Sequence, residues 1–186
     1  PSDHRFCQRC GWSLRLGDRY EAVSALKGGQ NSRTFVGRDL TTLVQSQCLI
    51  KQFTPYGETR LEQDATAERW RRDVGHLATA SQHPQIPNVV AYFERDRHQF
   101  LVQQFLTGPH LDQILQEKLG PFDSDEVWTF LRDVLPILHY LHQNRIIHRD
   151  IKPTNFRRPL GQPHWWLVDL GSIKPLTATS LAHQCT

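Results

Sequence analysis

Four polar side chains in the last third of the sequence have the types and spacing that phosphoryl transfer needs. Asp150, Lys152 and Asn155 stand close together, and Asp169 follows after a stretch long enough for a short hairpin. This chemistry requires a carboxylate that orients a hydroxyl, a cation on the migrating phosphate, and a carboxylate and an amide that hold Mg²⁺. The four residues supply these groups, which predicts a phosphate and metal site. The competing interpretation is a polar loop that joins two buried strands by chance.

These residues belong to a longer motif, H-R-D-I-K-P-T-N over residues 148–155 followed by D-L-G over residues 169–171. The order resembles that of the eukaryotic-like serine/threonine protein kinases of bacteria. The resemblance implies that Asp150 is the catalytic aspartate and that Lys152 is the lysine beside it in kinases of the Ser/Thr type. It also implies that Asn155 and Asp169 hold Mg²⁺, with ATP as the phosphate donor.

Strand-like segments precede this motif, and one of them holds a lysine near its end. Each segment is rich in β-branched or aromatic residues and is bounded by a Gly-rich or polar turn. The segments are Tyr20–Leu26, Arg33–Arg38, Cys48–Phe53, Val89–Glu94 and Gln99–Phe105. By the resemblance, C-L-I-K over residues 48–51 stands where the family has V-A-I-K, so Lys51 is expected to pair with the α- and β-phosphates of ATP. The alternative is a lysine at a solvated strand end.

The hairpin before that strand departs from the family's glycine loop, G-x-G-x-x-G. The corresponding residues are K-G-G-Q-N-S over residues 27–32, so Lys27 and Ser32 replace the outer glycines. Gly29 keeps its place and is expected to let the backbone approach a phosphate without obstruction by a Cβ atom. Lys27 either meets a phosphate or points to solvent, and the sequence leaves both interpretations open.

A helix is predicted over Leu61–Ala80, because apolar side chains recur there at the three-and-four spacing of one helix face. In the family, the corresponding helix supplies a glutamate that pairs with the strand lysine. Counting back from H-P-Q-I over residues 83–86 puts Asp73 at that position. An aspartate is one methylene shorter, so an ion pair with Lys51 requires the helix to lie closer.

The resemblance also implies an inter-lobe hinge at the end of the last predicted strand. Gln103 would guard the rear of the adenine pocket, and Gln104 and Leu106 would offer backbone groups to the adenine edge. Gly108-Pro109 then marks the passage to the second lobe. Backbone contacts impose little on side-chain identity, so these assignments rest on position in the chain.

Helical patterning resumes over Leu111–Lys118 and again after an acidic cap, D-S-D-E over residues 123–126. Apolar residues from Val127 to Leu141 share one face of the second helix, which predicts core packing. Pro136 is expected to kink this helix, because proline lacks a backbone donor and crowds the carbonyl four residues earlier. A hairpin after Asn155 then leads to Asp169.

Cys7 and Cys10 form a C-x-x-C-G knuckle near the start of the chain. Two thiolates at this spacing can occupy adjacent corners of a tetrahedral zinc site. Some bacterial members of the kinase family carry a zinc ribbon directly before the kinase domain, and residues 1–19 resemble the C-terminal half of such a ribbon. The alternative is an unmetallated tail with free thiols, because a site with two ligands binds zinc weakly.

Composition excludes several classes of function. The formal net charge is +3, and the Lys and Arg residues are scattered, which argues against a nucleic-acid partner. No apolar run is long enough for a membrane span, and no signal peptide is recognised. The four cysteines lack the dense spacing of a disulfide scaffold. We therefore expect a cytoplasmic protein.

The combined interpretation is an α+β, bilobal protein-kinase-like fold. The expected small lobe has five strands and one helix, and the helical lobe is expected to be truncated, because the A-P-E anchor and the later helices of the family are absent from the sequence. The expected domains are a zinc-ribbon remnant over residues 1–19, a small lobe over residues 20–106, and a partial helical lobe over residues 107–186 that ends in the activation segment.

Two functions follow from this interpretation. The first is an ATP- and Mg²⁺-dependent Ser/Thr kinase with a protein substrate, impaired by the truncation. The second is a pseudokinase-like module for nucleotide binding or protein interaction. The four motif residues favour the enzyme, whereas the altered glycine loop and Asp73 favour the module. A small-molecule phosphotransferase is disfavoured, because Lys152 two residues after Asp150 is the protein-kinase pattern.

Overall fold

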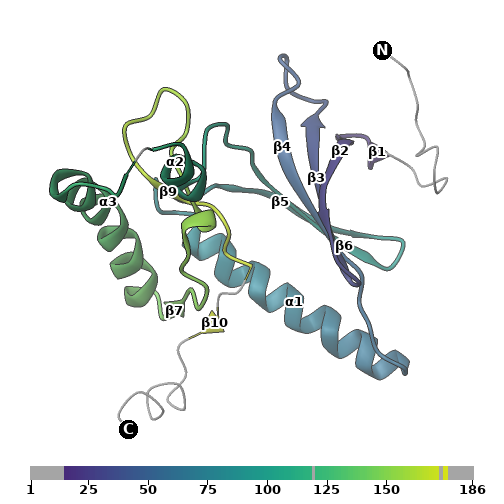
Figure 1. Ribbon diagram of the computed structural model, residues 1–186. Coiled ribbons are helices and arrows are strands. Elements are labelled where there is room, and N and C mark those ends of the chain that lie inside the picture. The colour runs from purple at the N-terminus through teal and green to yellow at the C-terminus, as the bar shows by residue number, and fades with distance from the viewer. Residues whose placement is uncertain (1–14, 119, 172–173, 176–186) are drawn as a thin grey trace, which may run out of the picture. The chain divides into compact units, whose positions relative to one another are not determined.

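The computed structural model describes residues 15–118, 120–171 and 174–175 (Figure 1). Cys7 and Cys10, with the rest of the predicted zinc-ribbon remnant before residue 15, lie outside this part of the chain. The chain divides into two compact units, and each is described by itself. The first contains the residues up to Trp70 together with Val89–Phe105, and the second contains Arg71–Asn88 and the residues from Leu106 onward.

The first unit is built on an antiparallel sheet of six strands in the order β1-β2-β3-β4-β6-β5. The strands are β1 (Arg15–Leu16), β2 (Tyr20–Gly28), β3 (Ser32–Asp39), β4 (Gln47–Phe53), β5 (Val89–Arg95) and β6 (His98–Gln104). Five of them correspond to the predicted segments. The short β1 corrects the prediction of five strands and lies within the stretch assigned to the zinc-ribbon remnant. It forms because Gly17 has a φ of +66°, which lets Leu16 turn back and pair with Tyr20.

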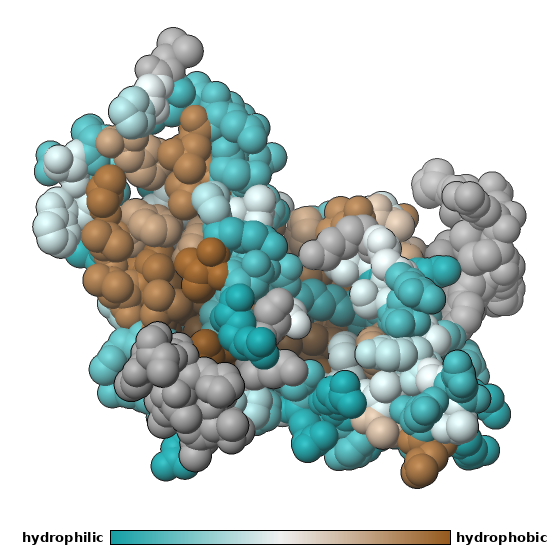
Figure 2. All heavy atoms as spheres, turned by 60° about the horizontal axis from the view of Figure 1, so that its bottom comes forward, coloured by the Kyte–Doolittle hydropathy of each residue, from teal (hydrophilic) through white to brown (hydrophobic). Residues whose placement is uncertain are grey.

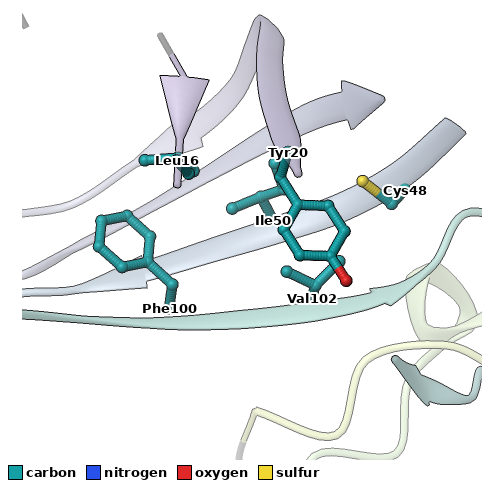
Figure 3. Close-up of a cluster of buried hydrophobic side chains, with 6 residues drawn as sticks. All are labelled: Leu16, Tyr20, Cys48, Ile50, Phe100 and Val102. Atoms are coloured by element: carbon teal, nitrogen blue, oxygen red, sulfur yellow. The ribbon is translucent and has the colours of Figure 1, made fainter. Parts of the chain in front are cut away.

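The core of the first unit lies on one face of this sheet. Figure 3 shows the buried side chains that form it: Leu16, Tyr20, Cys48, Ile50, Phe100 and Val102. The Tyr20 ring stacks on Phe93 with their centroids 6.0 Å apart, and Arg95 Nη1 donates to the carbonyl of Arg15 at 3.3 Å. The edge strands β1 and β5 therefore approach each other, and the sheet curls around the core.

Arg19 and Asp39 tie the start of β2 to the end of β3. Arg19 donates to Asp39 Oδ2 from Nε at 3.0 Å and from Nη2 at 2.7 Å. The backbone N–H and hydroxyl of Thr41 donate to the other carboxylate oxygen at 3.0 and 2.7 Å. The hydrogen bonds from Arg19 are the largest of the effects that lower the pKa of Asp39 from 3.8 to about 2.

We expect acid to remove the stability that this pair supplies. Because the pKa of Asp39 is depressed in the folded state, its contribution is complete above about pH 4 and is lost as the pH falls toward 2. Arg19 is 48% exposed and thus screened, so Asp39→Asn should lower the free energy of unfolding by about 1–2 kcal/mol at pH 7. Urea unfolding at pH 7 and at about pH 2.5 measures both proteins. An equal difference at both pH values would contradict the assignment.

The helix α1 (Arg60–Ala80) begins at a capping box. Thr59 Oγ1 accepts from the backbone N–H of Glu62 at 3.2 Å, and Glu62 Oε2 accepts from the backbone N–H of Thr59 at 3.2 Å. In the first unit, Trp70 of this helix stacks on Phe53 with their centroids 5.4 Å apart. In the second unit, the last turns of α1 bury Val74, Leu77 and Ala80. The observed bounds agree with the helix predicted over residues 61–80.

The second unit is mainly helical. Its remaining elements are α2 (Leu111–Glu117), α3 (Ser124–Gln143), β7 (Ile146–Ile147), the 3₁₀ helix η1 (Pro153–Asn155), β8 (Phe156–Arg157), β9 (Trp166–Leu167) and β10 (Lys174–Pro175). The acidic cap predicted before α3 is present, because Asp123 Oδ1 accepts from the N–H of Glu126 at 2.9 Å and Glu126 Oε2 accepts from the N–H of Asp123 at 2.8 Å. The helix continues through Pro136.

The apolar face of α3 is buried only in the C-terminal half of the helix. Val134 and Leu141 are buried, as the predicted core face requires, whereas Val127 is 42% exposed. Trp128 and Leu135 are exposed as well. Figure 2 shows hydrophobic residues gathered at the surface of the helical unit, on the left of the view. Within the described residues, none of the helices has the length and hydropathy needed to cross a bilayer.

Candidate active site

The H-R-D loop follows β7 and returns the chain on itself. Arg149 has a φ of +68°, which is uncommon for a residue with a side chain and is often found at functional sites. Pro153 opens η1, where a fixed φ suits the first position of a helical turn. The N–H of Asn155 then donates to the carbonyl of Lys152 at 2.9 Å. This turn brings Asn155 next to Asp150.

Asp150, Lys152 and Asn155 form a hydrogen-bonded group within the second unit. Lys152 Nζ lies 2.7 Å from Asp150 Oδ2, and Asn155 Nδ2 donates to the same oxygen at 3.2 Å and to the Asp150 carbonyl at 2.7 Å. Asn155 is 2% exposed, whereas the Asp150 side chain is 37% exposed. A buried amide thus fixes a carboxylate that faces solvent. Both side-chain contacts fall on Oδ2, so a ligand can approach Oδ1.

The group is held in its charged form. The hydrogen bond from Lys152 is the largest effect that lowers the pKa of Asp150, and Asn155 adds to it. Asp150 in turn raises the pKa of Lys152, with a smaller contribution from Asp169 in the same direction. At neutral pH, Asp150 is therefore a carboxylate that can accept a hydrogen bond from a hydroxyl, and Lys152 is an ammonium group.

His148 braces the loop from the inside. Its ring is 2% exposed, and Nδ1 accepts from the N–H of Asp150 at 3.3 Å. Burial lowers the pKa of His148, while the backbone of Asp169 and the nearby carboxylates act in the opposite direction. The imidazole is thus neutral at neutral pH, which is the form that accepts this hydrogen bond.

Asp169 lies two residues after the end of β9, next to Val168, which is hydrogen-bonded to Asn155. The N–H of Val168 donates to the carbonyl of Asn155 at 2.9 Å. On the far side, the N–H of Gly171 donates to Asp169 Oδ1 at 3.2 Å, and Leu170 is buried. The structure therefore brings together the predicted residues Asp150, Lys152, Asn155 and Asp169.

The side chains of Asn155 and Asp169 suit a hard divalent cation. Because Asn155 Nδ2 donates to Asp150, the amide presents Oδ1 to a cation. A carboxylate and an amide oxygen are ligands that Mg²⁺ prefers, and Mg²⁺ usually takes few protein ligands and completes its shell with water and phosphate. Among the described residues, no group of three or more His, Cys, Asp or Glu side chains forms a metal cage. The donor set thus fits Mg²⁺ shared with a nucleotide.

Lys51 and Gln104 lie in the first unit. Lys51 pairs with Thr34 of β3 and with Leu101 of β6, and strand alternation puts its side chain on the face opposite to the core cluster of Figure 3. Gln104 ends β6, where it pairs with Cys48. The contacts of Lys51 and Gln104 with ATP remain predictions. Asp73 lies in the second unit, and its ion pair with Lys51 also remains a prediction.

Gly29 forms the tip of the β2–β3 hairpin. Its N–H donates to the carbonyl of Ser32 at 2.7 Å. A Cβ atom placed on Gly29 would meet only the carbonyl and hydroxyl oxygens of Ser32, at 3.8 Å. Space at the tip does not by itself require glycine here, so the role of Gly29 toward a phosphate rests on the resemblance. The side chain of Lys27 lies outside the described part of the chain.

Arg157 is a residue of this region that the sequence did not single out. Its Nη1 donates to the carbonyl of Leu106 at 2.5 Å, and its Nη2 contacts Nε2 of His110. Burial lowers the pKa of Arg157. The Leu106 carbonyl, which the sequence placed at the adenine edge, thus accepts a hydrogen bond from Arg157. The one indication of Arg157 in the sequence was its place directly after Phe156, in the hairpin predicted after Asn155.

Comparisons with known proteins show which family the chain resembles. The model of the protein kinase domain matches residues 29–186. The chain is 36% identical over 174 residues to serine/threonine-protein kinase B of Synechocystis sp.. The matched region covers 94% of this chain and 30% of that protein. It is 34% identical over 186 residues to serine/threonine-protein kinase F of the same organism, with coverage of 94% and 37%. It is 31% identical over 172 residues to serine/threonine-protein kinase PknA of Nostoc sp., with coverage of 91% and 30%. The chain thus spans about a third of the length of these relatives.

Proposed function

This chain belongs to the protein kinase domain family, and we propose that it transfers the γ-phosphate of ATP to Ser or Thr hydroxyls of a protein substrate. The observation that carries this proposal is the hydrogen-bonded group of Asp150, Lys152 and Asn155. A solvent-facing carboxylate, kept ionised by an ammonium group and fixed by a buried amide, is the arrangement that an acceptor hydroxyl requires.

Each side chain has a proposed role that follows from its position. Asp150 Oδ1 accepts the hydrogen bond of the substrate hydroxyl and orients its oxygen toward the γ-phosphate. Lys152 neutralises charge on the transferring phosphate while it holds Oδ2 of Asp150. Lys51 binds the α- and β-phosphates, and Gly29 lets the backbone approach them. Gln104 and Leu106 offer backbone groups to the adenine edge.

Asn155 and Asp169 are proposed to hold Mg²⁺ between them. The ion, when bound, supplies positive charge that neutralises the phosphate oxygens. Asn155 contributes its amide oxygen because its nitrogen is committed to Asp150. Asp169 contributes a carboxylate that β9 and the N–H of Gly171 hold in place.

A pseudokinase-like module is the second candidate. It is favoured by the hairpin of residues 27–32, which keeps only Gly29 of the family's three glycines, and by the shorter side chain of Asp73. Such a chain would bind nucleotide weakly and act through contacts with other proteins. The altered hairpin and Asp73 would affect the binding of the nucleotide, whereas the group of Asp150, Lys152 and Asn155 would affect transfer of its phosphate. Nucleotide affinity and phosphoryl transfer must therefore be measured separately.

Nucleotide binding is tested by thermal unfolding. We expect millimolar ATP with Mg²⁺ to raise the Tm by about 5–10 °C, because a ligand at about 100 times its Kd stabilises a folded domain by about 2.7 kcal/mol. Asp169→Asn should remove most of this shift, because it removes a carboxylate from the metal site. Asp125→Asn, which changes an exposed carboxylate in the first turn of α3, should keep the shift. An unchanged Tm of the unsubstituted chain in ATP and Mg²⁺ would favour the module.

The remaining expectations of the sequence concern zinc and location. Cys7 and Cys10 are proposed as half of a zinc ribbon on the strength of the C-x-x-C spacing. The protein is proposed to act in the cytoplasm on a protein substrate, without a nucleic-acid partner, in line with its small net charge and sparse cysteines.

A further inference from the structure

Trp165 is held by its backbone as well as by its side chain, four residues before Asp169. Its N–H donates to Asp133 Oδ2 of α3 at 2.8 Å, and its carbonyl accepts from Gln85 Nε2 at 2.8 Å. The indole is fully buried and meets the ring of Phe130 edge-on at 5.6 Å. Two side chains from distant parts of the sequence thus fix one peptide segment at the entry to β9.

Gln85 also hydrogen-bonds to the edge of β9 that does not pair with β8. Besides the side-chain bond to Trp165, its backbone carbonyl accepts from the N–H of Leu167 at 3.0 Å. The other edge of β9 pairs with β8, with Phe156 opposite Leu167. The two-residue strand is therefore hydrogen-bonded on both edges, and Asp169 follows two residues after Leu167.

The carboxylate of Asp133 is nearly buried and accepts hydrogen bonds through both of its oxygens. Its side chain is 11% exposed, and its second oxygen accepts from Nδ1 of His164 at 2.9 Å. Both carboxylate oxygens are thus used by consecutive residues, His164 and Trp165. Removal of the carboxylate leaves the buried N–H of Trp165 without its acceptor on Asp133, and we expect this loss to displace the entry to β9.

We propose that Asp133 and Gln85 are positioning residues that set the place of the Asp169 carboxylate through β9. The proposal rests on the proposed function, because it assigns Asp169 to a metal ion. Residues that orient metal ligands without touching the metal typically change metal affinity by about 10–100-fold when they are replaced. Neither residue belongs to the H-R-D or D-L-G motif, and their contacts with Trp165 are visible only in the fold.

The test measures Mn²⁺ affinity by electron paramagnetic resonance of the 186-residue chain in the presence of ATP, at a temperature far below unfolding. Asp133→Ala and Gln85→Ala should each weaken Mn²⁺ binding by about 10–100-fold. Asp133→Asn keeps an oxygen acceptor for the Trp165 N–H and should stay within about 3-fold of the unsubstituted chain. The matched controls, Asp125→Ala on α3 and Gln82→Ala beside Gln85, should leave the affinity unchanged. Thermal unfolding of the metal-free variants separates loss of stability from loss of affinity.

The outcomes separate this inference from the proposed function. If the unsubstituted chain binds Mn²⁺ with ATP and the alanine variants bind it equally well, Asp133 and Gln85 only stabilise the fold and the inference fails alone. If the unsubstituted chain binds no Mn²⁺ with ATP, the proposed metal site fails and the inference falls with it. Should Asp133→Ala not fold, equal affinities of Gln85→Ala and Gln82→Ala would still overturn the inference.

Discussion

Asp150→Asn is expected to lower phosphoryl transfer to a protein substrate by about 100- to 10,000-fold, the range typical for removal of a positioned general base. The substitution keeps the size of the side chain and removes its charge. Asparagine can still meet Lys152 through its oxygen, but it no longer presents a carboxylate oxygen to the acceptor hydroxyl. The loss should therefore appear in transfer and not in folding.

The measurement is transfer of labelled phosphate by the protein, with ATP affinity measured in parallel. ATP affinity should change by less than about 3-fold, because Asp150 faces the acceptor and not the nucleotide in the proposed site. Asp125→Asn serves as the control for loss of a carboxylate elsewhere in the same unit. Transfer that survives Asp150→Asn at the unsubstituted rate would remove Asp150 from the chemistry and leave the pseudokinase-like module as the better interpretation.

The parts of the site that the sequence predicted are those whose geometry is local. Asp150, Lys152 and Asn155 lie within one turn of chain, and Pro153 fixes the turn that brings them together. Such short-range order is encoded by residue type and spacing, so the motif and the contacts agree. The helix predicted over residues 61–80 was likewise found, because its apolar period is a local signal.

The parts that the sequence did not predict depend on residues far apart in the chain. Arg157 meets the Leu106 carbonyl across a separation of 51 residues, and no local pattern announces that contact. The strand β1 forms because Leu16 finds a place in a core supplied by β4 and β6. Val127 has the period of a buried helix face and is nevertheless exposed. Periodicity reports which side chains can share a face, whereas burial depends on what packs against it.

Gly108→Ala is expected to cost about 3–5 kcal/mol of unfolding free energy, because two independent penalties fall on one position. Gly108 has a φ of +125°, a conformation that residues with a side chain rarely adopt. A Cβ atom there would lie 2.3 Å from the carbonyl oxygen of Arg158 and 3.0 Å from the nitrogen of Leu160. These are backbone atoms, so no flexible side chain can move aside.

The surrounding hydrogen bonds prevent an easy escape. The N–H of Leu160 donates to the Thr107 carbonyl at 3.0 Å, and the N–H of Arg158 donates to the Pro109 carbonyl at 3.1 Å. Any shift that makes room for the methyl group must stretch one or both of these bonds. The substitution should therefore lower the Tm by about 6–20 °C in a chain of this size.

Gly161→Ala is the matched control for this prediction. Gly161 also has a positive φ, of +75°, but a Cβ atom there meets nothing within 4 Å. Alanine at this position carries the conformational penalty alone, which is about 1–2 kcal/mol. Urea unfolding of both variants separates the two contributions, because only Gly108→Ala adds the clash with Arg158 and Leu160. Equal losses of unfolding free energy in the two variants would mean that the backbone around Gly108 shifts to make room for the methyl group. The close packing of residues 107–109 against residues 158–160 would then not be what fixes the start of the helical unit.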